Sequence, residues 1–196
     1  NGLRSGKSIH YYENGKVESE CSYKNGVREG SCHYYSMSGI LQVEKVYDND
    51  HVVGYRHLLP DGTISQLFPF DPSGDFTLKA YFPNKELSCL QEYKDGLIHG
   101  SLKYYETNGT VQEEGHYSHG ELSGPYRHFF ANGQLSSESH YKYDELEGVQ
   151  KFFFPNGKLR KVVNWHMGKQ NGEEIVFSTD GKVKKRNYYW NDELYQ

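Results

Sequence analysis

The stretch Tyr104–Gly124, YYETNGTVQEEGHYSHGELSG, contains the pattern that decides the fold. An aromatic pair precedes an Asn-Gly dipeptide, Val111 follows Gly109 by two positions, and Tyr117 follows it by eight. Asn-Gly is typical of tight β-hairpin turns, because such turns need positive φ angles. Positions two and eight after the turn have the same parity, so both side chains lie on one face of an extended strand.

The same three positions recur along the chain about every 24 residues. The turn position holds Gly15, Gly39, Gly62, Lys85, Gly109, Gly133, Gly157 and Gly181. The aliphatic position holds Val17, Leu41, Ile64, Leu87, Val111, Leu135, Leu159 and Val183. The aromatic position holds Tyr23, Tyr47, Phe70, Tyr93, Tyr117, Tyr141, Trp165 and Tyr189. Stacked hairpins stabilise their neighbours. The sequence therefore predicts an all-β fold of tandem hairpin repeats in an elongated, twisted antiparallel sheet, with little helix.

We expect one repeat domain over residues 1–196, made of about eight units. Their approximate bounds are 1–24, 25–48, 49–71, 72–94, 95–118, 119–142, 143–166 and 167–196. Residues 51–90 are degenerate and hold four of the six prolines: Pro60, Pro69, Pro72 and Pro83. Proline removes a ladder hydrogen bond, so this segment either bends the array or is a decayed repeat. Both chain ends fall at the same point of the repeat, which predicts that the sequence is part of a longer chain.

Charge is distributed unevenly around a net value of −4. Residues 1–154 carry −7 and residues 155–196 carry +3. The overall acidity argues against a general nucleic-acid binder, and no apolar run is long enough for a transmembrane helix. The basic segment fits an acidic partner, an anionic lipid surface or a solvated strand face. Candidate lipid- or anion-binding residues are Lys158, Arg160, Lys161, Lys182, Lys184, Lys185 and Arg186.

Catalytic and metal-binding patterns are weak in this sequence. His116 and His140 occupy one column, but equivalent positions two strands apart are separated by about 9.6 Å, too far to share a zinc ion. A recurring glutamate, at Glu20, Glu44, Glu114 and Glu138, is interpreted as a partner for cross-strand cations. No hydrolase, phosphate-binding or dinucleotide-binding motif is found. We predict a protein that is not an enzyme and has no metal and no cofactor.

The three cysteines do not form a disulfide framework. Cys21 and Cys32 flank the Asn25-Gly26 turn and could face one another, and a disulfide there needs Cα atoms within about 7 Å. We expect free thiols in a reducing compartment, and therefore a cytoplasmic protein. Cys89 is expected to be a small apolar filler.

The strings YYENGKVESECSYKNGVREG (11–30) and YYETNGTVQEEGHYSHGELSG (104–124) resemble the MORN-repeat variant family. That family occurs in many bacterial proteins, including antitoxin-like components of toxin–antitoxin pairs. The resemblance implies a row of antiparallel hairpins used for protein scaffolding, dimerisation and phospholipid contact. The usual period here is 24 rather than 23, and the second glycine of the family's G-x-G is replaced by Ser8, Cys32, Leu102, Tyr126, Gln150 and Glu174.

Paired rings before each turn point to both faces of the strand, so a single-layer sheet must expose one of them. Exposed rigid aromatics suit a protein partner. The candidate contact residues are Tyr12, Tyr34, Tyr104, His128, Phe130 and Phe152. We therefore predict a repeat scaffold that binds a protein partner, possible roles being antitoxin-like or immunity-like. Alternatives are a membrane-surface binder, and a targeting or regulatory appendage of an enzyme domain outside this chain. Free sheet edges also permit an edge-to-edge homodimer.

Overall fold

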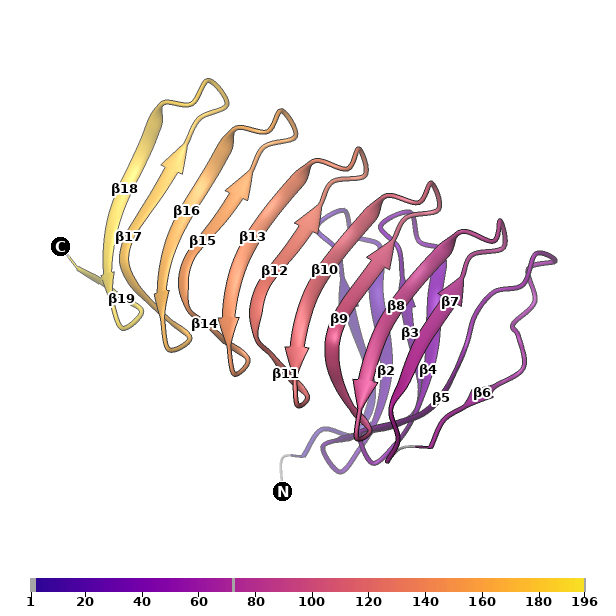
Figure 1. The fold of residues 1–196 in the computed structure, drawn as a ribbon. Helices are drawn as coiled ribbons and strands as arrows, with labels where there is room; N and C mark the ends of the chain where they lie inside the picture. Colours follow the sequence, from indigo (N-terminus) through magenta and orange to yellow (C-terminus); the bar gives the residue numbers. More distant parts are fainter. Residues whose placement is uncertain (1–2, 72, 196) are drawn as a thin grey trace. The chain divides into compact units, whose positions relative to one another are not determined.

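The computed structural model describes residues 3–71 and 73–195, and every regular element in this part of the chain is a β-strand (Figure 1). The chain forms two compact units, unit 1 (residues 1–112) and unit 2 (residues 113–196). The all-β class and the antiparallel hairpin repeats predicted from the sequence are confirmed.

Unit 1 contains two antiparallel sheets. The six strands of the first sheet pair in chain order and are β1 (Gly6–Tyr11), β2 (Val17–Lys24), β3 (Val27–Tyr35), β4 (Leu41–Asp48), β5 (His51–Arg56) and β6 (Phe68–Pro69). The second contains β7 (Phe76–Tyr81), β8 (Leu87–Lys94) and β9 (Leu97–Tyr105). In Figure 1 the strands β2–β4 lie behind β7–β9.

Unit 2 continues the hairpin pattern. Unit 2 begins inside β10 (Val111–Ser118), at Glu113. Its other main strands are β12 (Gly124–Phe129), β13 (Leu135–Lys142), β15 (Gly148–Phe153), β16 (Leu159–His166), β17 (Lys169–Phe177), β18 (Val183–Trp190) and β19 (Glu193–Tyr195). Each pairs antiparallel with the next. Two short strands, β11 (Glu121–Leu122) and β14 (Glu145–Leu146), pair with the ends of β10 and β13.

The turn inside a hairpin differs from the turn that links it to the next hairpin. At Asn25-Gly26 both residues have positive φ, 52° and 92°, which is the type I′ geometry expected of Asn-Gly. At Asn14-Gly15 only the glycine has positive φ (80°), and the strand register shifts between His10 and Tyr11. This is a bulged turn. Asn-Gly thus marks both kinds of turn, because a bulged turn also needs its glycine at the left-handed position.

The hairpin ladder is interrupted inside the proline-containing segment. Strand β5 pairs with β6 over two residue pairs only, Gly54↔Pro69 and Tyr55↔Phe68, and β6 and β7 belong to different sheets. Proline cannot donate a ladder hydrogen bond, and here the chain leaves the first sheet of unit 1 and enters the second. This agrees with the hypothesis that the segment redirects the array, and it replaces the single continuous sheet expected from the period.

Between its two sheets, unit 1 has a buried core that a single-layer sheet would lack. Val43, Leu78, Ala80 and Cys89 are all 0% exposed, and Phe82 is 1% exposed. The expectation that Cys89 is a buried apolar filler is confirmed. Polar side chains also join the sheets: Gln42 donates to the Tyr105 carbonyl at 2.8 Å, and Ser88 Oγ donates to the Gln42 carbonyl at 2.6 Å.

The expectation of free thiols at Cys21 and Cys32 is wrong in this structure. The two residues are directly opposite on β2 and β3, with Cα atoms 4.1 Å apart, and they form a disulfide. The cytoplasmic location drawn from free thiols loses that support and stays a prediction.

Thiol titration checks the disulfide. We expect the denatured, unreduced protein to react with one equivalent of a thiol reagent, at Cys89, and the reduced protein with three. The Cys89→Ser variant, which removes the buried thiol outside the disulfide, should give none before reduction and two after. Three reactive thiols in unreduced wild-type protein would contradict the pairing.

Candidate functional site

Directly paired residues of antiparallel strands point to the same face of a sheet. In unit 2 one such row crosses seven strands, and we call the face that carries it the inner face. The row runs through Glu113, His128, Ser137, Phe152, Lys161, Val176 and Lys185.

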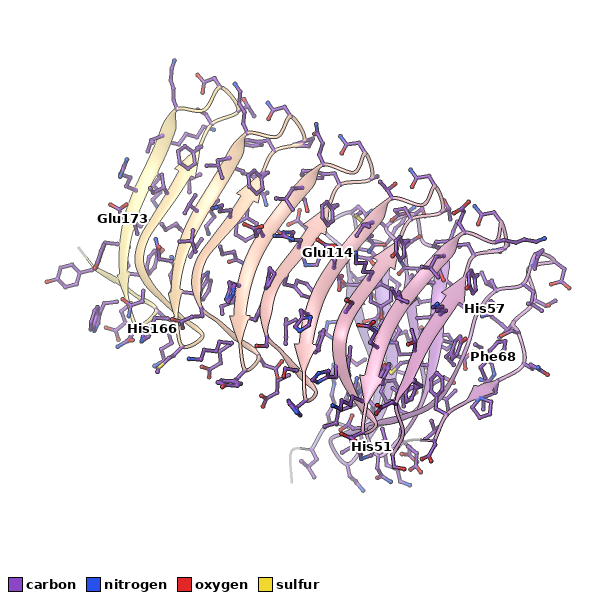
Figure 2. The ribbon with its side chains drawn as sticks, viewed as in Figure 1. His51, His57, Phe68, Glu114, His166 and Glu173 are labelled. Carbon is purple, nitrogen blue, oxygen red and sulfur yellow. A yellow bond between two sulfur atoms is a disulfide. The ribbon has the colours of Figure 1, made fainter. Side chains whose placement is uncertain are left out.

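The opposite, outer face of unit 2 carries a row of alternating charges. Its members are Glu114, Arg127, Glu138, Lys151, Val162, Ile175 and Arg186. Arg127 donates to Glu138 at 2.8 Å and to Glu114 (labelled in Figure 2) at 3.2 Å. These bonds raise the pKa of the Arg127 guanidinium. The interpretation of the recurring glutamates as cross-strand partners is confirmed, and the outer-face charges largely satisfy one another.

In β4 and β7–β9 of unit 1 the positions equivalent to the inner-face row are core, as Val43 shows at 0% exposed. Ala80 and Cys89, which pair directly, are both 0% exposed, and Tyr104, which pairs with Cys89, is 7% exposed. In unit 2 the equivalent Phe152 and Val176 are only half-buried and Lys185 is exposed. This face of the repeat is thus covered by a second sheet over β4 and β7–β9 of unit 1, whereas in unit 2 the residues of the row from Ser137 to Lys185 are half-buried or exposed.

Three of the six predicted contact residues belong to unit 1 and have structural partners there. Tyr104 receives hydrogen bonds from Lys45 Nζ at 3.0 Å and Gln91 Nε2 at 3.2 Å, and its ring stacks on Tyr34 at 6.0 Å. Tyr12 accepts from Gln112 at 2.6 Å. Tyr104 is buried, so its prediction as an accessible contact residue is wrong. The rings of Tyr12 and Tyr34 are half-buried and their hydroxyls are hydrogen-bonded within unit 1.

The other three candidates, His128, Phe130 and Phe152, lie in unit 2 and remain partly accessible. His128 Nδ1 lies 3.6 Å from Glu113 Oε2, and 44% of its side chain is exposed. Phe130 occupies the repeat position of Phe82, which faces the core in unit 1, but Phe130 itself is half-buried. Whether these three residues contact a partner stays a prediction.

Trp165 occupies the aromatic position of the repeat, and the structure leaves it half-buried. Its indole Nε1 donates to Gln150 Oε1 at 3.0 Å. At the same repeat position, Tyr47 and Tyr93 of unit 1 are 5% and 8% exposed. The parity of Trp165 relative to Lys161 shows that both lie on the inner face.

Nearby, Tyr126 donates a hydrogen bond to Glu113 at the start of the inner face. Burial, reinforced by the charge of Glu113, raises the pKa of Tyr126 well above its usual range. Tyr126 is therefore a neutral donor at every physiological pH.

The seven basic candidates do not form one surface. Lys158 Nζ donates to the Asp180 carbonyl of the next hairpin turn at 3.3 Å, Lys182 pairs with the Asp180 carboxylate at 3.3 Å, and Arg186 approaches Glu173 at 3.6 Å on the outer face. Lys161 and Lys185 belong to the inner-face row. Arg160 and Lys184 precede them at the register shifts of β16 and β18, and Arg160 lies over the Phe152 ring at 5.6 Å.

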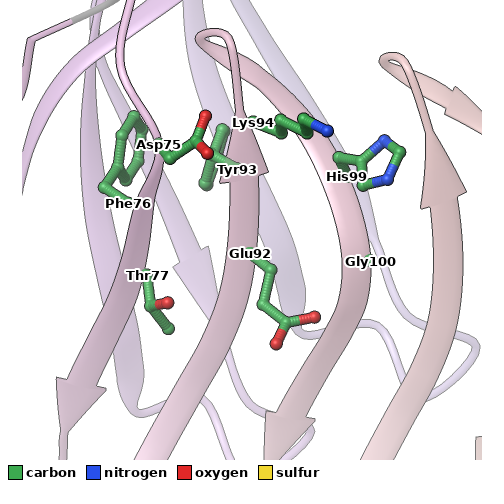
Figure 3. A pocket seen from close by; sticks show the side chains of 8 residues that line it. All are labelled: Asp75, Phe76, Thr77, Glu92, Tyr93, Lys94, His99 and Gly100. Atoms are coloured by element: carbon green, nitrogen blue, oxygen red, sulfur yellow. The ribbon is translucent and has the colours of Figure 1, made fainter.

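A shallow pocket of about 390 Å³ lies on strands β7–β9, lined by Asp75, Thr77, Glu92, Lys94 and His99 among others (Figure 3). Its carboxylates already bind backbone amides. Glu92 accepts from Ser101 N at 2.6 Å, and Asp75 accepts from Asp95 N at 2.9 Å. These contacts give both acids a structural role in the strand ends.

Residues 3–71 and 73–195 contain no cluster of three or more His, Cys, Asp or Glu side chains arranged to hold a metal ion. In the same residues there is no helix of the length and apolar character needed to cross a membrane.

The MORN repeat variant family matches residues 4–25, 98–119, 122–143, 146–166 and 170–191, which together make up more than half of the chain. The chain belongs to the MORN repeat variant family. A matched MORN segment spans both strands of one hairpin, as 122–143 spans β12 and β13. The unmatched stretch between the first and second MORN segments contains the break between the sheets of unit 1.

No curated protein shows significant similarity to this MORN-variant chain. A solved chain from the "Crystal Structure of TcdB2-TccC3-Cdc42" shares 13% identity with a TM-score of 0.22. The match covers 95% of the MORN-variant chain and 11% of that chain. A likeness this low carries no argument about fold or function.

Proposed function

We propose that this protein is a non-enzymatic MORN-variant scaffold that binds a protein partner through the inner face of unit 2. Repeats of this family serve as scaffolds for interaction with proteins or membranes. One observation carries the proposal: the face that a second sheet covers in unit 1 is accessible in unit 2 and carries aromatic rings.

The two faces of unit 2 differ in how far their side chains are already satisfied. On the outer face, Arg127 is held between two carboxylates. On the inner face, Phe130, Phe152 and Trp165 are half-buried. Covering such rings removes apolar surface from water at about 25 cal/mol per Å², and a rigid ring loses little entropy on binding. The inner face therefore gains more from a partner than the outer face does.

An antitoxin-like or immunity-like role is the form of this function that the family resemblance favours. In that case the partner is a toxin whose active surface is blocked by the scaffold. The recurring glutamates have no catalytic role in this function, because Glu114 and Glu138 form ion pairs with Arg127 within the sheet.

Affinity capture with matched variants tests this function. We expect the Phe130→Ala/Phe152→Ala double variant to lose at least about tenfold of the partner recovered by the wild-type chain, because truncating buried interface rings costs about 2 kcal/mol or more. The control is Val149→Ala, which removes an exposed side chain of the same strand as Phe152 (Val149 is 45% exposed) but from the outer face. Each variant is compared with wild type by circular dichroism.

The proposal fails if the double variant recovers the partner as well as wild type does, or if Val149→Ala is the variant that loses it. It also fails if no protein is recovered while vesicles containing phosphatidylserine bind the chain in a salt-sensitive manner. That last result would favour the membrane-surface function instead.

A further inference from the structure

The inner face of unit 2 becomes strongly basic toward β18. Strands β15–β18 carry four cations on or beside the inner-face row: Arg160, Lys161, Lys184 and Lys185. The same four strands hold two carboxylates, Glu173 and Glu174.

Both carboxylates are already engaged. Glu174 binds Lys161 Nζ at 2.5 Å and accepts from Asn187 Nδ2 at 2.9 Å. Burial would raise the pKa of Glu174, but the hydrogen bonds from Lys161 and Asn187 outweigh it and lower that pKa. Glu173 lies 3.6 Å from Arg186 on the outer face. Among the described residues, no carboxylate lies within 4.0 Å of Arg160, Lys184 or Lys185.

Unit 1 shows what this repeat position does when the face is covered. Arg160 and Lys184 stand where Gln42 and Gln112 stand in unit 1. There, Gln42 Nε2 donates to the Tyr105 carbonyl at 2.8 Å and to Gln112 Oε1 at 3.0 Å, so the side chain bonds to the covering polypeptide. With a guanidinium and an ammonium in place of the amides, the complementary acceptor on a covering polypeptide is a carboxylate.

We propose that the inner face over β15–β18 binds an acidic protein segment. The segment's carboxylates pair with Arg160, Lys184 and Lys185, and its apolar side chains pack on Phe152 and Trp165. This inference rests on the proposed function and names the partner's chemistry. A polypeptide is favoured over a polynucleotide or a lipid headgroup because the equivalent face of unit 1 is covered by polypeptide.

The test uses poly-L-glutamate as an acidic polypeptide and Trp165 as the reporter. The chain has two tryptophans, so the Trp190→Phe background leaves Trp165 alone. At about 20 mM salt, where surface charges are weakly screened, we expect poly-L-glutamate to change the Trp165 emission. We expect at least about tenfold weaker binding after Lys184→Glu/Lys185→Glu, and loss of binding near 300 mM salt.

The matched control is Lys24→Glu/Lys79→Glu in unit 1, which changes net charge by the same amount at two exposed lysines. The affinity of this control for poly-L-glutamate should stay within about twofold of that of the Trp190→Phe protein. Equal weakening in both doubles, or no binding to poly-L-glutamate, overturns the proposal. Parallel titrations use oligo-dT and vesicles with about 30% phosphatidylserine. If the chain binds oligo-dT or these vesicles more tightly than poly-L-glutamate, the ligand class is a polynucleotide or a lipid surface and the proposal is wrong.

The outcome is separable from that of the proposed function. If the captured partner depends on Phe130 and Phe152 but poly-L-glutamate does not bind, the scaffold function stands and the acidic class is wrong.

Discussion

Replacing Phe82 by alanine is expected to lower the free energy of unfolding by about 3–5 kcal/mol, the usual cost of removing a fully buried phenylalanine. The same substitution at Phe130 is expected to cost about 1–2 kcal/mol, because that ring already contacts water and leaves a smaller cavity. The two residues occupy the same repeat position, but Phe82 is 1% exposed and Phe130 is half-buried. Urea denaturation followed by far-ultraviolet circular dichroism measures both.

This pair is a direct test of the difference between the two units, since residue type and repeat position are matched. Equal losses at Phe82 and Phe130 would mean that the inner face is covered to the same extent in both units. The accessible face on which the proposed function depends would then not exist. A larger loss at Phe130 would contradict the structure outright.

The repeat itself was predictable from the sequence because its signals are local. Gly109, Val111 and Tyr117 fix a turn and one face of a strand within nine residues, and the same spacing recurs along the chain. Neighbouring hairpins then pair because each has the same length and register. Nothing in this reasoning needs a contact between distant parts of the sequence.

The covered face of unit 1 was not predictable in the same way, because it depends on contacts between residues far apart in sequence. Lys45 and Tyr104, for example, are joined across the two sheets. Tyr104 and Phe152 occupy the same column, so the repeat pattern treats them alike. A usable signal did exist: Ala80 and Cys89 are small residues where unit 2 has Phe152 and Lys161, and small side chains let sheets approach closely.

The candidate site was predicted only in part, for a related reason. His128, Phe130 and Phe152 were selected because one face of a single sheet must be exposed, and in unit 2 they remain partly accessible. The basic residues were found by composition, which cannot show that Arg186 and Lys185 point to opposite faces. Strand register separates them, and Arg160 lies over the Phe152 ring.

The second large effect is expected at Glu106, whose carboxylate joins the two sheets of unit 1. It is 7% exposed and accepts hydrogen bonds from Met37 N at 3.0 Å and Ser38 Oγ at 3.1 Å, both in a turn of the other sheet. Glu106→Ala should lower the free energy of unfolding by about 2–4 kcal/mol, because hydrogen bonds to a charged acceptor are lost and a backbone N–H is left unpaired.

Two further variants separate the hydrogen bonds from the loss of side-chain volume. Glu106→Gln keeps one acceptor oxygen and nearly the same shape, so we expect it to recover about half of the loss. Glu86→Ala, at an exposed glutamate in a hairpin turn of unit 1, should change stability by less than about 0.5 kcal/mol. If Glu106→Ala and Glu106→Gln unfold at the same urea concentration as wild type, this carboxylate does not hold the sheets together. The packing of the two sheets of unit 1 would then depend on apolar contacts around Phe82, and the hydrogen bonds between the sheets would add little to stability.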